Sequence, residues 1–183
     1  MSTPAADHRQ AAADHRARCA VLTVSDTRTP DTDVGGRLIR EHLAQAGHDV
    51  VDHAIVRDES IAIDQQLQYW LTPPESAAPE AAAPPHAILT TGGTGVARRD
   101  TTIEVVEALI DKPLPGFGEL FRVLSHQEIG AAAMLSRATA GLATAPQGDC
   151  FLFALPGSPH AVELALTQLI LPELPHLVWE RGR

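Results

Sequence analysis

The feature that most constrains this chain is a short apolar run that ends in a glycine turn. Residues 87–91 have the sequence AILTT, which is the apolar and β-branched pattern of a buried strand, and Gly92-Gly93-Thr94-Gly95 follows directly. A helix start at Thr101 and a second glycine cluster, 116–122, come next. Glycine amides can approach an anion closely, and a helix N-terminus adds partial positive charge. The stretch 87–122 therefore predicts a phosphate site built from two glycine loops that flank one short helix.

Composition narrows the class of protein. With 183 residues, of which 44% are hydrophobic and 20% charged, the chain is expected to form one globular domain. A net charge of -9 argues against a nucleic-acid partner. No run of eighteen apolar residues and no signal-peptide core occur, so no membrane partner and a cytoplasmic location are expected. Cys19 and Cys150 open apolar runs and are interpreted as small buried hydrophobic residues.

The chain is expected to divide into a tail, a domain and one insertion. Residues 1–17 are polar and alanine-rich, which predicts a flexible N-terminal tail, and residues 18–183 form the single domain. Within it, residues 73–85 are almost wholly proline, alanine, glutamate and serine. That composition cannot bury a face, so this stretch is predicted to be an exposed insertion loop.

Strands and helices are predicted to alternate along the domain. Further strands are expected at 19–24, 49–56 and 150–155. Helices are expected after a cap at 31–33 with Gly47 at the end, after a cap at Asp58, and after Ser158 with Pro159 at the first helical position. The alternation indicates the α/β class, with a parallel or mostly parallel sheet between helical layers.

Three of the predicted strands end in polar or glycine-rich turns. These turns are Ser25-Asp26, Thr90 to Gly95, and Pro156-Gly157-Ser158. In an open parallel sheet the ligand crevice lies outside the carboxyl ends of the strands, so the three turns are expected to meet around one pocket. The glycine turn alone leaves two interpretations open, a phosphate loop or only a tight turn, because it lacks the ending of a P-loop and the spacing of a dinucleotide fingerprint.

Asp100 and Asp26 are the candidate Mg²⁺ and phosphate-orienting carboxylates. Thr101-Thr102-Ile103-Glu104 fits a capping box, which would leave the Asp100 side chain free. Asp26 follows a strand end, where a Ser-Asp pair is also ordinary turn chemistry. Two carboxylates at neighbouring strand ends suit Mg²⁺, which takes one or two carboxylates with phosphate oxygens and waters.

The segment after the short helix offers weaker candidates. Residues 117, 120, 121 and 124 are apolar at helical spacing, which predicts an amphipathic helix with these side chains in the core. Glu119 suits the first turn of that helix through the helix dipole alone. Ser136 and Arg137 are candidates for anion binding, and an arginine that pairs with the last carbonyls of a helix is the equal alternative. Ser158 is interpreted first as a cap.

These motifs, in this order, resemble the molybdenum-cofactor biosynthesis family of the MoaB/MogA type, with the MoaB branch as the nearest. The motifs that carry the resemblance are Thr90 to Gly95, Arg99-Asp100, Gly116 to Arg122, Met134 to Arg137, Leu155 to Pro159, Val24 to Asp26, and Ala46 to His48. Together they cover most of the chain from Cys19 onward.

The resemblance implies a three-layer α/β/α fold that binds molybdopterin. It further implies adenylyl transfer, in which the terminal phosphate of molybdopterin attacks the α-phosphorus of Mg-ATP, with a non-catalytic molybdopterin carrier of the same fold as the alternative. By position, Asp26 and Asp100 correspond to the magnesium and nucleotide carboxylates, and the loop residues Thr91, Gly92, Gly93, Thr94 and Gly95 to the phosphate cradle. Ser25, Glu119, Ser136, Pro156, Gly157 and Ser158 correspond to residues around the ligands. A homotrimer or homohexamer is implied, as are contacts with other enzymes of the molybdenum-cofactor pathway.

Overall fold

The structure is a computed structural model that describes residue 12 and residues 15–74, 83–145 and 147–182. These residues form a six-stranded sheet in the spatial order β2-β1-β3-β6-β5-β4. The strand bounds are Arg18–Val24 (β1), Asp49–Val56 (β2), Ala87–Thr91 (β3), Lys112–Pro113 (β4), Thr139–Ala145 (β5) and Gly148–Leu155 (β6). Strands β2, β1, β3 and β6 run parallel, and β5 pairs antiparallel with β6 and β4. The predicted mostly parallel α/β sheet is confirmed.

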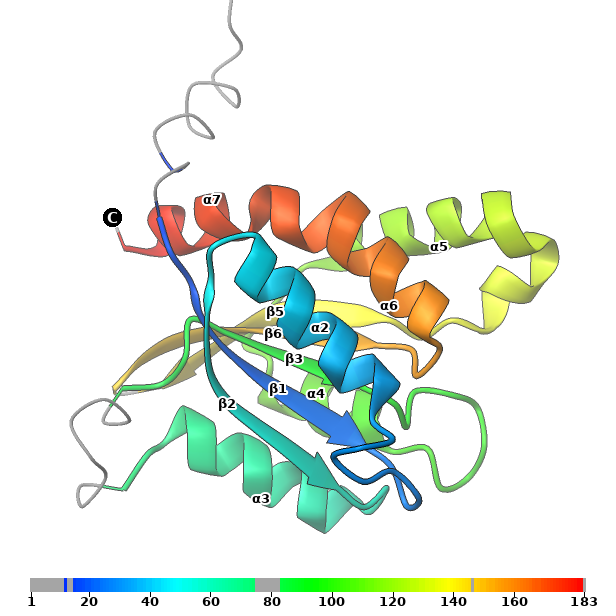
Figure 1. The fold of residues 1–183 in the computed structure, drawn as a ribbon, viewed down its shortest axis with the longest axis horizontal. Helices are drawn as coiled ribbons and strands as arrows, with labels where there is room; N and C mark the ends of the chain where they lie inside the picture. The colour runs from blue at the N-terminus through cyan, green and yellow to red at the C-terminus, as the bar shows by residue number, and fades with distance from the viewer. Residues whose placement is uncertain (1–11, 13–14, 75–82, 146, 183) are drawn as a thin grey trace, which may run out of the picture.

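Helices cover both faces of the sheet and make three layers (Figure 1). The helices are Val34–Gln45 (α2), Ser60–Leu71 (α3), Thr102–Leu109 (α4), Pro115–Ile129 (α5), Pro159–Ala165 (α6) and Leu171–Arg181 (α7), with a 3-10 helix Gly130–Leu135 (η2) and a π-helical turn Leu166–Ile170 (η3). One core cluster joins the sheet to α2 and to α5 through α7, and the other joins it to α3 and α4. Along β1, Cys19 and Val21 belong to the first cluster, and Ala20 and Leu22 to the second. The continuous apolar run of this strand thus reflects burial on both faces.

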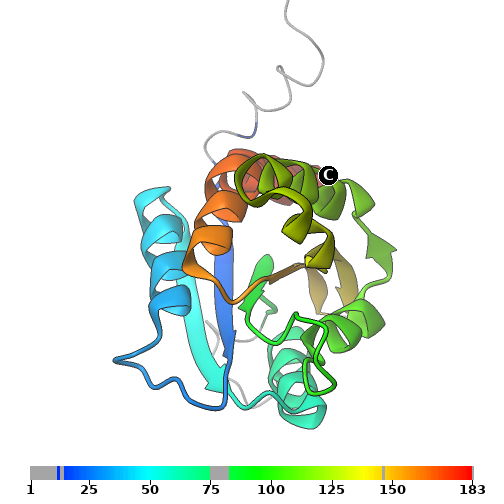
Figure 2. The ribbon, with the colours of Figure 1, turned by 90° about the vertical axis from the view of Figure 1, so that its right-hand side faces the viewer.

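The loops that follow β1 and β3 lie at the same edge of the sheet. Figure 2 looks onto this edge, where the strands of the parallel part end between the two helical layers. The two free cysteines, Cys19 and Cys150, are fully buried as predicted. Burial raises the pKa of the Cys19 thiol to about 12, so both residues are inert core residues.

Strands β4 and β5 form the part of the sheet that sequence reasoning missed. β5 has the sequence TAGLATA, whose small residues carry little intrinsic strand preference. The requirement for small residues comes from packing instead: a Cβ at Gly141 would lie 2.3 Å from the Cγ2 of Ile110 and 2.8 Å from the carbonyl oxygen of Lys112. Residues 110–112 therefore pack so closely on β5 that position 141 requires glycine. The local sequence pattern does not show this contact, so it did not reveal the strand.

The predicted start and end of helix α2 are confirmed. The Asp33 carboxylate accepts a hydrogen bond from the Gly36 N–H at 2.9 Å, and Gly47 follows the helix with a φ of 83°. This is an aspartate N-cap paired with a left-handed glycine at the other end.

The predicted cap of helix α3 at Asp58 is wrong. The helix begins at Ser60, and Glu59 occupies the capping position with an extended backbone and no side-chain hydrogen bond. The apolar face of α3 is buried as predicted, through Ile63, Leu67, Trp70 and Leu71. Asp58 lies one residue too early to cap this helix, and its carboxylate faces the glycine turn instead.

The second glycine cluster, 116–122, is not a loop, which corrects the sequence prediction. It forms the first turns of α5, because Pro115 at the first helical position starts the helix there. The buried positions are Gly118, Phe121 and Ser125, while Leu120, predicted to be in the core, is 55% exposed. The helix is therefore rotated relative to the predicted apolar face.

The last helical run, Pro159–Arg181, contains a π turn and two later prolines. Pro172 and Pro175 lack the N–H that would continue the regular ladder, and the Leu171 N–H bonds the Leu166 carbonyl, five residues back. By length and composition alone this run could cross a membrane. Its apolar side chains have another explanation, because Val162, Ala165, Leu166, Ile170 and Leu174 are fully or almost fully buried against the sheet.

The structure shifts the borders of the tail and of the insertion. Residues 1–11 and 13–14 of the predicted tail lie outside the described residues, but Ala17 is buried and its N–H donates to His48 Nδ1 at 3.2 Å. Of the predicted insertion 73–85, residues 75–82 lie outside the described part. Pro84 and Pro85 are buried, not exposed as predicted, so the domain resumes before β3 begins.

Candidate functional site

The turns after β1, β3 and β6 meet at one edge of the sheet, as the sequence predicts. The Gly92 N–H donates to the carbonyl oxygen of Leu155 at 3.3 Å, and the Thr91 hydroxyl donates to that of Pro156 at 3.0 Å. A Cβ at Gly157 would lie 3.3 Å from the Cα of Gly92, so the two backbones are in direct contact. The hydrogen bond from Thr91 to Pro156 thus joins the two turns to each other.

Each glycine of the turn is required for a different reason. Gly92 and Gly93 have φ values of 97° and 62°, a region that favours glycine. A Cβ at Gly92 would lie 2.3 Å from the Val24 carbonyl oxygen, and one at Gly95 would lie 2.5 Å from an Asp100 oxygen. Because the Gly92 N–H is bonded within the sheet, the amides left to face an anion are those of Gly93, Thr94 and Gly95. The Gly92 N–H is therefore already bonded to Leu155 and does not donate within the predicted phosphate cradle.

Asp26 lies at the carboxyl end of β1 and is surrounded by donors. Its Oδ1 accepts a hydrogen bond from the Asp58 N–H at 3.2 Å. The guanidinium groups of Arg57 and Arg99 each lie 3.9 Å from one of its oxygens. The carboxylate is still 37% exposed, so it remains accessible to a ligand at this edge.

Asp58 is the functional candidate that sequence reasoning missed. Its Oδ1 is buried and has no hydrogen-bond partner among the described residues. Burial raises the pKa of this carboxyl group, and the charges of Asp100 and Asp26 raise it further, against a lowering by the Thr101 N–H and Arg99. A buried carboxylate oxygen without a partner is costly unless a cation or a proton meets it.

Asp100 is held within the loop that follows the glycine turn. Its Oδ2 accepts a hydrogen bond from the Ala97 N–H at 3.0 Å, and it does not cap helix α4. The predicted capping box is wrong in its bonds: Thr101 occupies the capping position, but its hydroxyl is buried without a partner in the described chain. Glu104, the other half of the box, pairs with Arg137 instead.

Arg137 holds the glycine loop from another part of the chain. Its guanidinium donates to the carbonyl oxygens of Thr94 at 3.1 Å and Asp100 at 3.2 Å, and to the Glu104 carboxylate. The hydrogen bond from Arg137 lowers the pKa of Glu104. The alternative of an arginine paired with the last carbonyls of its own helix is wrong, because the guanidinium bonds the backbone of the loop instead, and the anion-binding alternative stays a prediction. Arg137 is therefore a positioning residue.

A small cavity of about 270 Å³ lies beside the joined turns. Ser25, Thr91, Gly92 and Gly157 line it, together with Asp33 and neighbouring residues. The Ser25 hydroxyl accepts hydrogen bonds from the N–H groups of Thr27 and Arg28, which shapes the loop after β1. Ser158 caps helix α6 by accepting from the Ala161 N–H at 3.1 Å, which confirms its interpretation as a cap.

Glu119 and Ser136 line a separate, larger cavity of about 610 Å³. It lies between α4, α5 and β5, and Arg137 belongs to its wall. The site predicted as one pocket is thus made of two cavities and the carboxylate-bearing loop between them. Arg137 connects them physically, because one guanidinium lines the larger cavity and bonds the glycine loop.

The fold described above agrees with the protein family that this sequence matches. The family described as "Probable molybdopterin binding domain" matches residues 20–176 of this chain. The chain belongs to this family. The matched range contains all of the elements from β2 to α6, so the sheet edge with its three turns lies inside it.

Relatives of this family share most of their length with the chain. Molybdenum cofactor biosynthesis protein B of Staphylococcus carnosus is 48% identical over 177 residues, covering 95% of this chain and 96% of the relative. The protein of the same name from Halalkalibacterium halodurans is 51% identical over 164 residues, covering 89% of each. A crystal structure of a molybdenum cofactor biosynthesis protein B matches with a TM-score of 0.80 at 45% identity, over 92% of this chain and 98% of that chain. The resemblance to the MoaB/MogA type and the three-layer fold are confirmed.

The strand-end rule that identified Asp26 would also have identified Asp58. Asp58 follows β2, which runs parallel to β1 and ends at the same edge. The sequence analysis assigned it to a helix cap, and that assignment hid it. Arg137 was a candidate from the sequence, but no local signal indicates its contacts with the glycine loop, because its partners lie 33 to 43 residues away in sequence.

Proposed function

We propose that this chain acts in molybdenum cofactor biosynthesis, where it binds molybdopterin and transfers AMP from Mg-ATP to the terminal phosphate of molybdopterin. The observation that carries the proposal is one sheet edge that combines the backbone amides of the glycine turn, Gly93 to Gly95, with three aspartates, Asp26, Asp58 and Asp100. Amides suit phosphate oxygens, and carboxylates suit the magnesium ion that accompanies ATP. The names of the relatives support the pathway assignment.

The reaction requires positioning and charge neutralisation more than a covalent nucleophile. An oxygen of the pterin phosphate forms a bond to the α-phosphorus of ATP, and the bond from that phosphorus to the pyrophosphate oxygen breaks, so pyrophosphate leaves. The amides of Gly93, Thr94 and Gly95 would hold phosphate oxygens in line. Arg137 keeps these amides in place through its bonds to Thr94 and Asp100. Arg99, beside Asp26, adds positive charge at the same edge.

Mg²⁺ fits the carboxylates of this edge. One or two of the carboxylates of Asp26, Asp58 and Asp100 would hold the ion, which supplies charge neutralisation on the phosphates. The described residues contain no group of three or more His, Cys, Asp or Glu side chains placed to hold a metal by themselves. The ion would therefore be shared between one or two carboxylates and phosphate oxygens, which is the ordinary arrangement for Mg²⁺ with a nucleotide.

The direct test is to incubate the purified protein with molybdopterin, Mg²⁺ and ATP and to measure adenylylated pterin and pyrophosphate. Asp58→Asn and Asp100→Asn are each expected to lower turnover by about 100-fold or more, since each removes a charge that only the magnesium nucleotide needs. Asp64→Asn makes the same chemical change on helix α3, outside the site, and should leave turnover unchanged. Full activity of the Asp58 and Asp100 variants would contradict the assignment.

The alternative function is a non-catalytic molybdopterin-binding or carrier protein. It is supported by the two cavities, which would hold a pterin whether or not a magnesium nucleotide binds at the carboxylates. The two functions separate in the wild-type protein. Saturable pterin binding with no pyrophosphate released on addition of Mg-ATP would establish the carrier and exclude the transferase.

We also propose that the chain assembles as a homotrimer or homohexamer through α5 and η2. Five large apolar side chains on these two elements are more than half exposed, namely Leu120, Val123, Ile129, Met134 and Leu135. An apolar groove of about 550 Å³ runs along the same surface, and Met134 and Arg122 line both this groove and the cavity of Glu119. A contiguous apolar surface of this kind favours burial against another protein surface. Met134→Lys should shift the sedimentation coefficient to that of a monomer, whereas a monomeric wild type would refute the assembly.

A further inference from the structure

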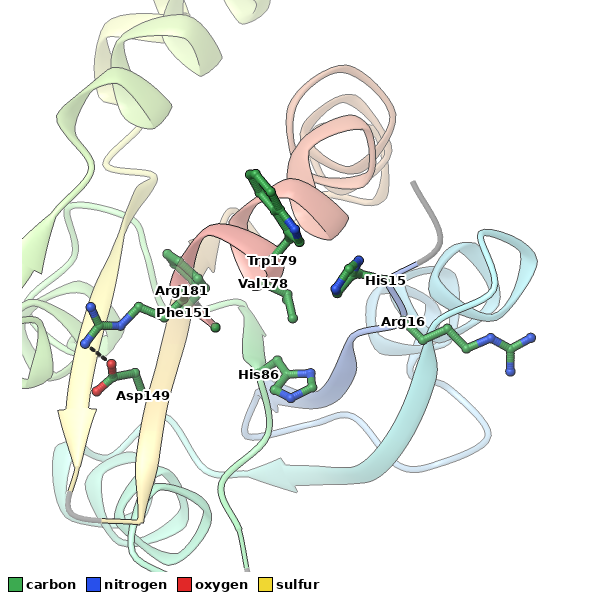
Figure 3. Close-up of a pocket in the computed structure, with 9 residues that line it drawn as sticks. His15, Arg16, His86, Asp149, Phe151, Val178, Trp179 and Arg181 are labelled. Atoms are coloured by element: carbon green, nitrogen blue, oxygen red, sulfur yellow. Dashed lines mark ion pairs between the residues drawn. The ribbon is translucent and has the colours of Figure 1, made fainter. Parts of the chain in front are cut away.

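A further cavity, of about 550 Å³, lies at the opposite edge of the sheet from the carboxylate-bearing loop. It is lined by the residues just before β1, by the residue before β3, by the start of β6 and by the last turn of α7 (Figure 3). These are the amino-terminal ends of the same parallel strands whose carboxyl ends carry the site described above. The proposed adenylyl transfer makes no use of this cavity.

His86 is fixed in this cavity in one orientation. Its N–H donates to the Arg18 carbonyl oxygen at 2.8 Å, its carbonyl oxygen accepts from the Phe151 N–H at 2.8 Å, and its ring Nδ1 accepts from the Arg18 N–H at 3.1 Å. Because Nδ1 accepts, the neutral ring must carry its proton on Nε2. Burial, and then the charge of Arg18, lowers the pKa of His86, which keeps the ring neutral.

The Nε2–H of His86 is therefore a donor in the wall of the cavity. No hydrogen bond from it is formed to any residue of the described chain, and the ring is only partly buried. Figure 3 shows the imidazole between the strand ends, below Val178 and beside His15. A ligand with an acceptor group can complete this hydrogen bond without displacing a partner.

The remaining walls combine flat apolar surfaces with positive charge. The rings of Trp179 and Phe151 line the cavity together with Val178. Arg16 and Arg181 line it as well, and the acid among the lining residues, Asp149, is already paired with Arg181. The lining thus carries a positive surplus on a chain whose net charge is -9, which favours an anion locally.

We propose that this cavity is a second ligand site, which binds a small aromatic carboxylate with its ring against Trp179 and Phe151 and its carboxylate on the His86 Nε2–H. The volume lies in the range of small-molecule sites, where mainly apolar walls carry a few placed polar groups. Aromatic rings provide the contact area, the histidine fixes the orientation of the carboxylate, and Arg16 provides the positive charge that selects an anion, since Arg181 is paired with Asp149. The site is independent of nucleotide and pterin.

The test uses 2-naphthoate as the probe and the indole N–H signals of the full chain in ¹H–¹⁵N NMR spectra. The chain has two tryptophans, so two such signals are expected. Trp179 lines the cavity, whereas the Trp70 Nε1–H donates to Asp52 in the core beneath α3 and serves as an internal control. The Trp179 signal should shift saturably with 2-naphthoate while the Trp70 signal stays in place. An unmoved Trp179 signal, or an equal response to the uncharged 2-naphthamide, would overturn the proposal.

Two variants test the residues named. His86→Phe removes the donor and keeps a ring of similar shape, and it should weaken 2-naphthoate binding at least about tenfold. Arg16→Ala removes a rim charge from an exposed side chain and should weaken it about threefold. Arg98→Ala removes the same charge from the opposite sheet edge and should have no effect. If His86→Phe does not fold, as judged by loss of the Trp70 signal, Arg16→Ala against Arg98→Ala decides the question, and equal binding by all three proteins would refute the site.

Discussion

The two glycine-rich segments, 92–95 and 116–118, resemble each other in sequence and differ in what they require of glycine. In the first, Gly92 and Gly93 have positive φ values, and an added Cβ would come within 2.5 Å of another atom at Gly92, Gly93 and Gly95. In the second, which lies within helix α5, no φ is positive, and a Cβ at Gly116 would meet nothing within 4 Å. Glycine clusters thus mark a tight turn in one place and a helix start in the other. The backbone conformation and the neighbouring atoms, and not the sequence pattern, distinguish the two segments.

The largest effect is expected from Gly92→Ala. The new Cβ would lie 2.3 Å from the Val24 carbonyl oxygen, at a φ of 97°, so both sterics and backbone conformation oppose it. The free energy of unfolding should fall by about 3 kcal/mol or more, measured by urea denaturation. A change below about 1 kcal/mol would show that the turn can rearrange and would remove the basis of the comparison.

A smaller loss is expected from Gly118→Ala in the second segment. The Cβ would lie 2.7 Å from the Ala138 carbonyl oxygen, but the backbone conformation is helical and suits alanine. Displacement of α5 from β5 should lower the free energy of unfolding by about 1–3 kcal/mol. In the same denaturation series this variant should fall between Gly92→Ala and the wild type, and a loss equal to that of Gly92→Ala would break the distinction.

Asp58→Asn tests the carboxylate that packs behind the first segment. The pKa of Asp58 is raised in the fold above its ordinary 3.8, so the ionised form is the destabilising one. Wild-type stability is therefore lost as the pH rises through the folded-state pKa. Asp58→Asn should be more stable at pH 7 by less than about 1 kcal/mol, or no more than roughly 2–4 °C in Tm, because solvent screens the partly exposed charge. The gain should shrink as the pH is lowered toward 4.

The matched change for Asp58→Asn in the second segment is Glu119→Gln. Glu119 is exposed on α5, and its substitution should alter the free energy of unfolding by less than about 0.5 kcal/mol at either pH. A gain from Asp58→Asn that is equal at pH 4 and pH 7 would show that charge is not its cause.

Among the glycine substitutions, the smallest effect is expected from Gly116→Ala, and its sign is opposite to that of Gly92→Ala and Gly118→Ala. This position is in the first turn of α5 with open space around it, so alanine lowers the entropy of the unfolded chain without a clash. The free energy of unfolding should rise by about 0.5–1 kcal/mol. A destabilised variant would mean that the second segment also depends on glycine conformation.

Local sequence patterns predicted the strands whose own residues indicate burial. They missed the elements whose residues are explained only by contacts with residues distant in sequence. The buried strands β1, β3 and β6 were predictable because continuous apolar runs leave few alternatives, and their turns met because parallel strands end together. β5 was not predictable, since Gly141 is selected by contact with Ile110 and Lys112. The same holds in the site: Asp26 and Asp100 were identified from strand ends and caps, whereas Arg137 acts across 37 residues or more on the backbone of Thr94 and Asp100.

The hydrogen bonds of Arg137 to residues distant in sequence affect the stage of synthesis at which the glycine turn can take its final shape. The glycine turn is bonded to Leu155 and Pro156, and the loop behind it is bonded to Arg137, all of which leave the ribosome after the turn itself. Closing these long loops is entropically costly until the later strands have paired. A nascent chain that ends before β6 therefore has the sequence of the glycine turn without the contacts that shape it, and the turn reaches its final form only when the sheet is complete.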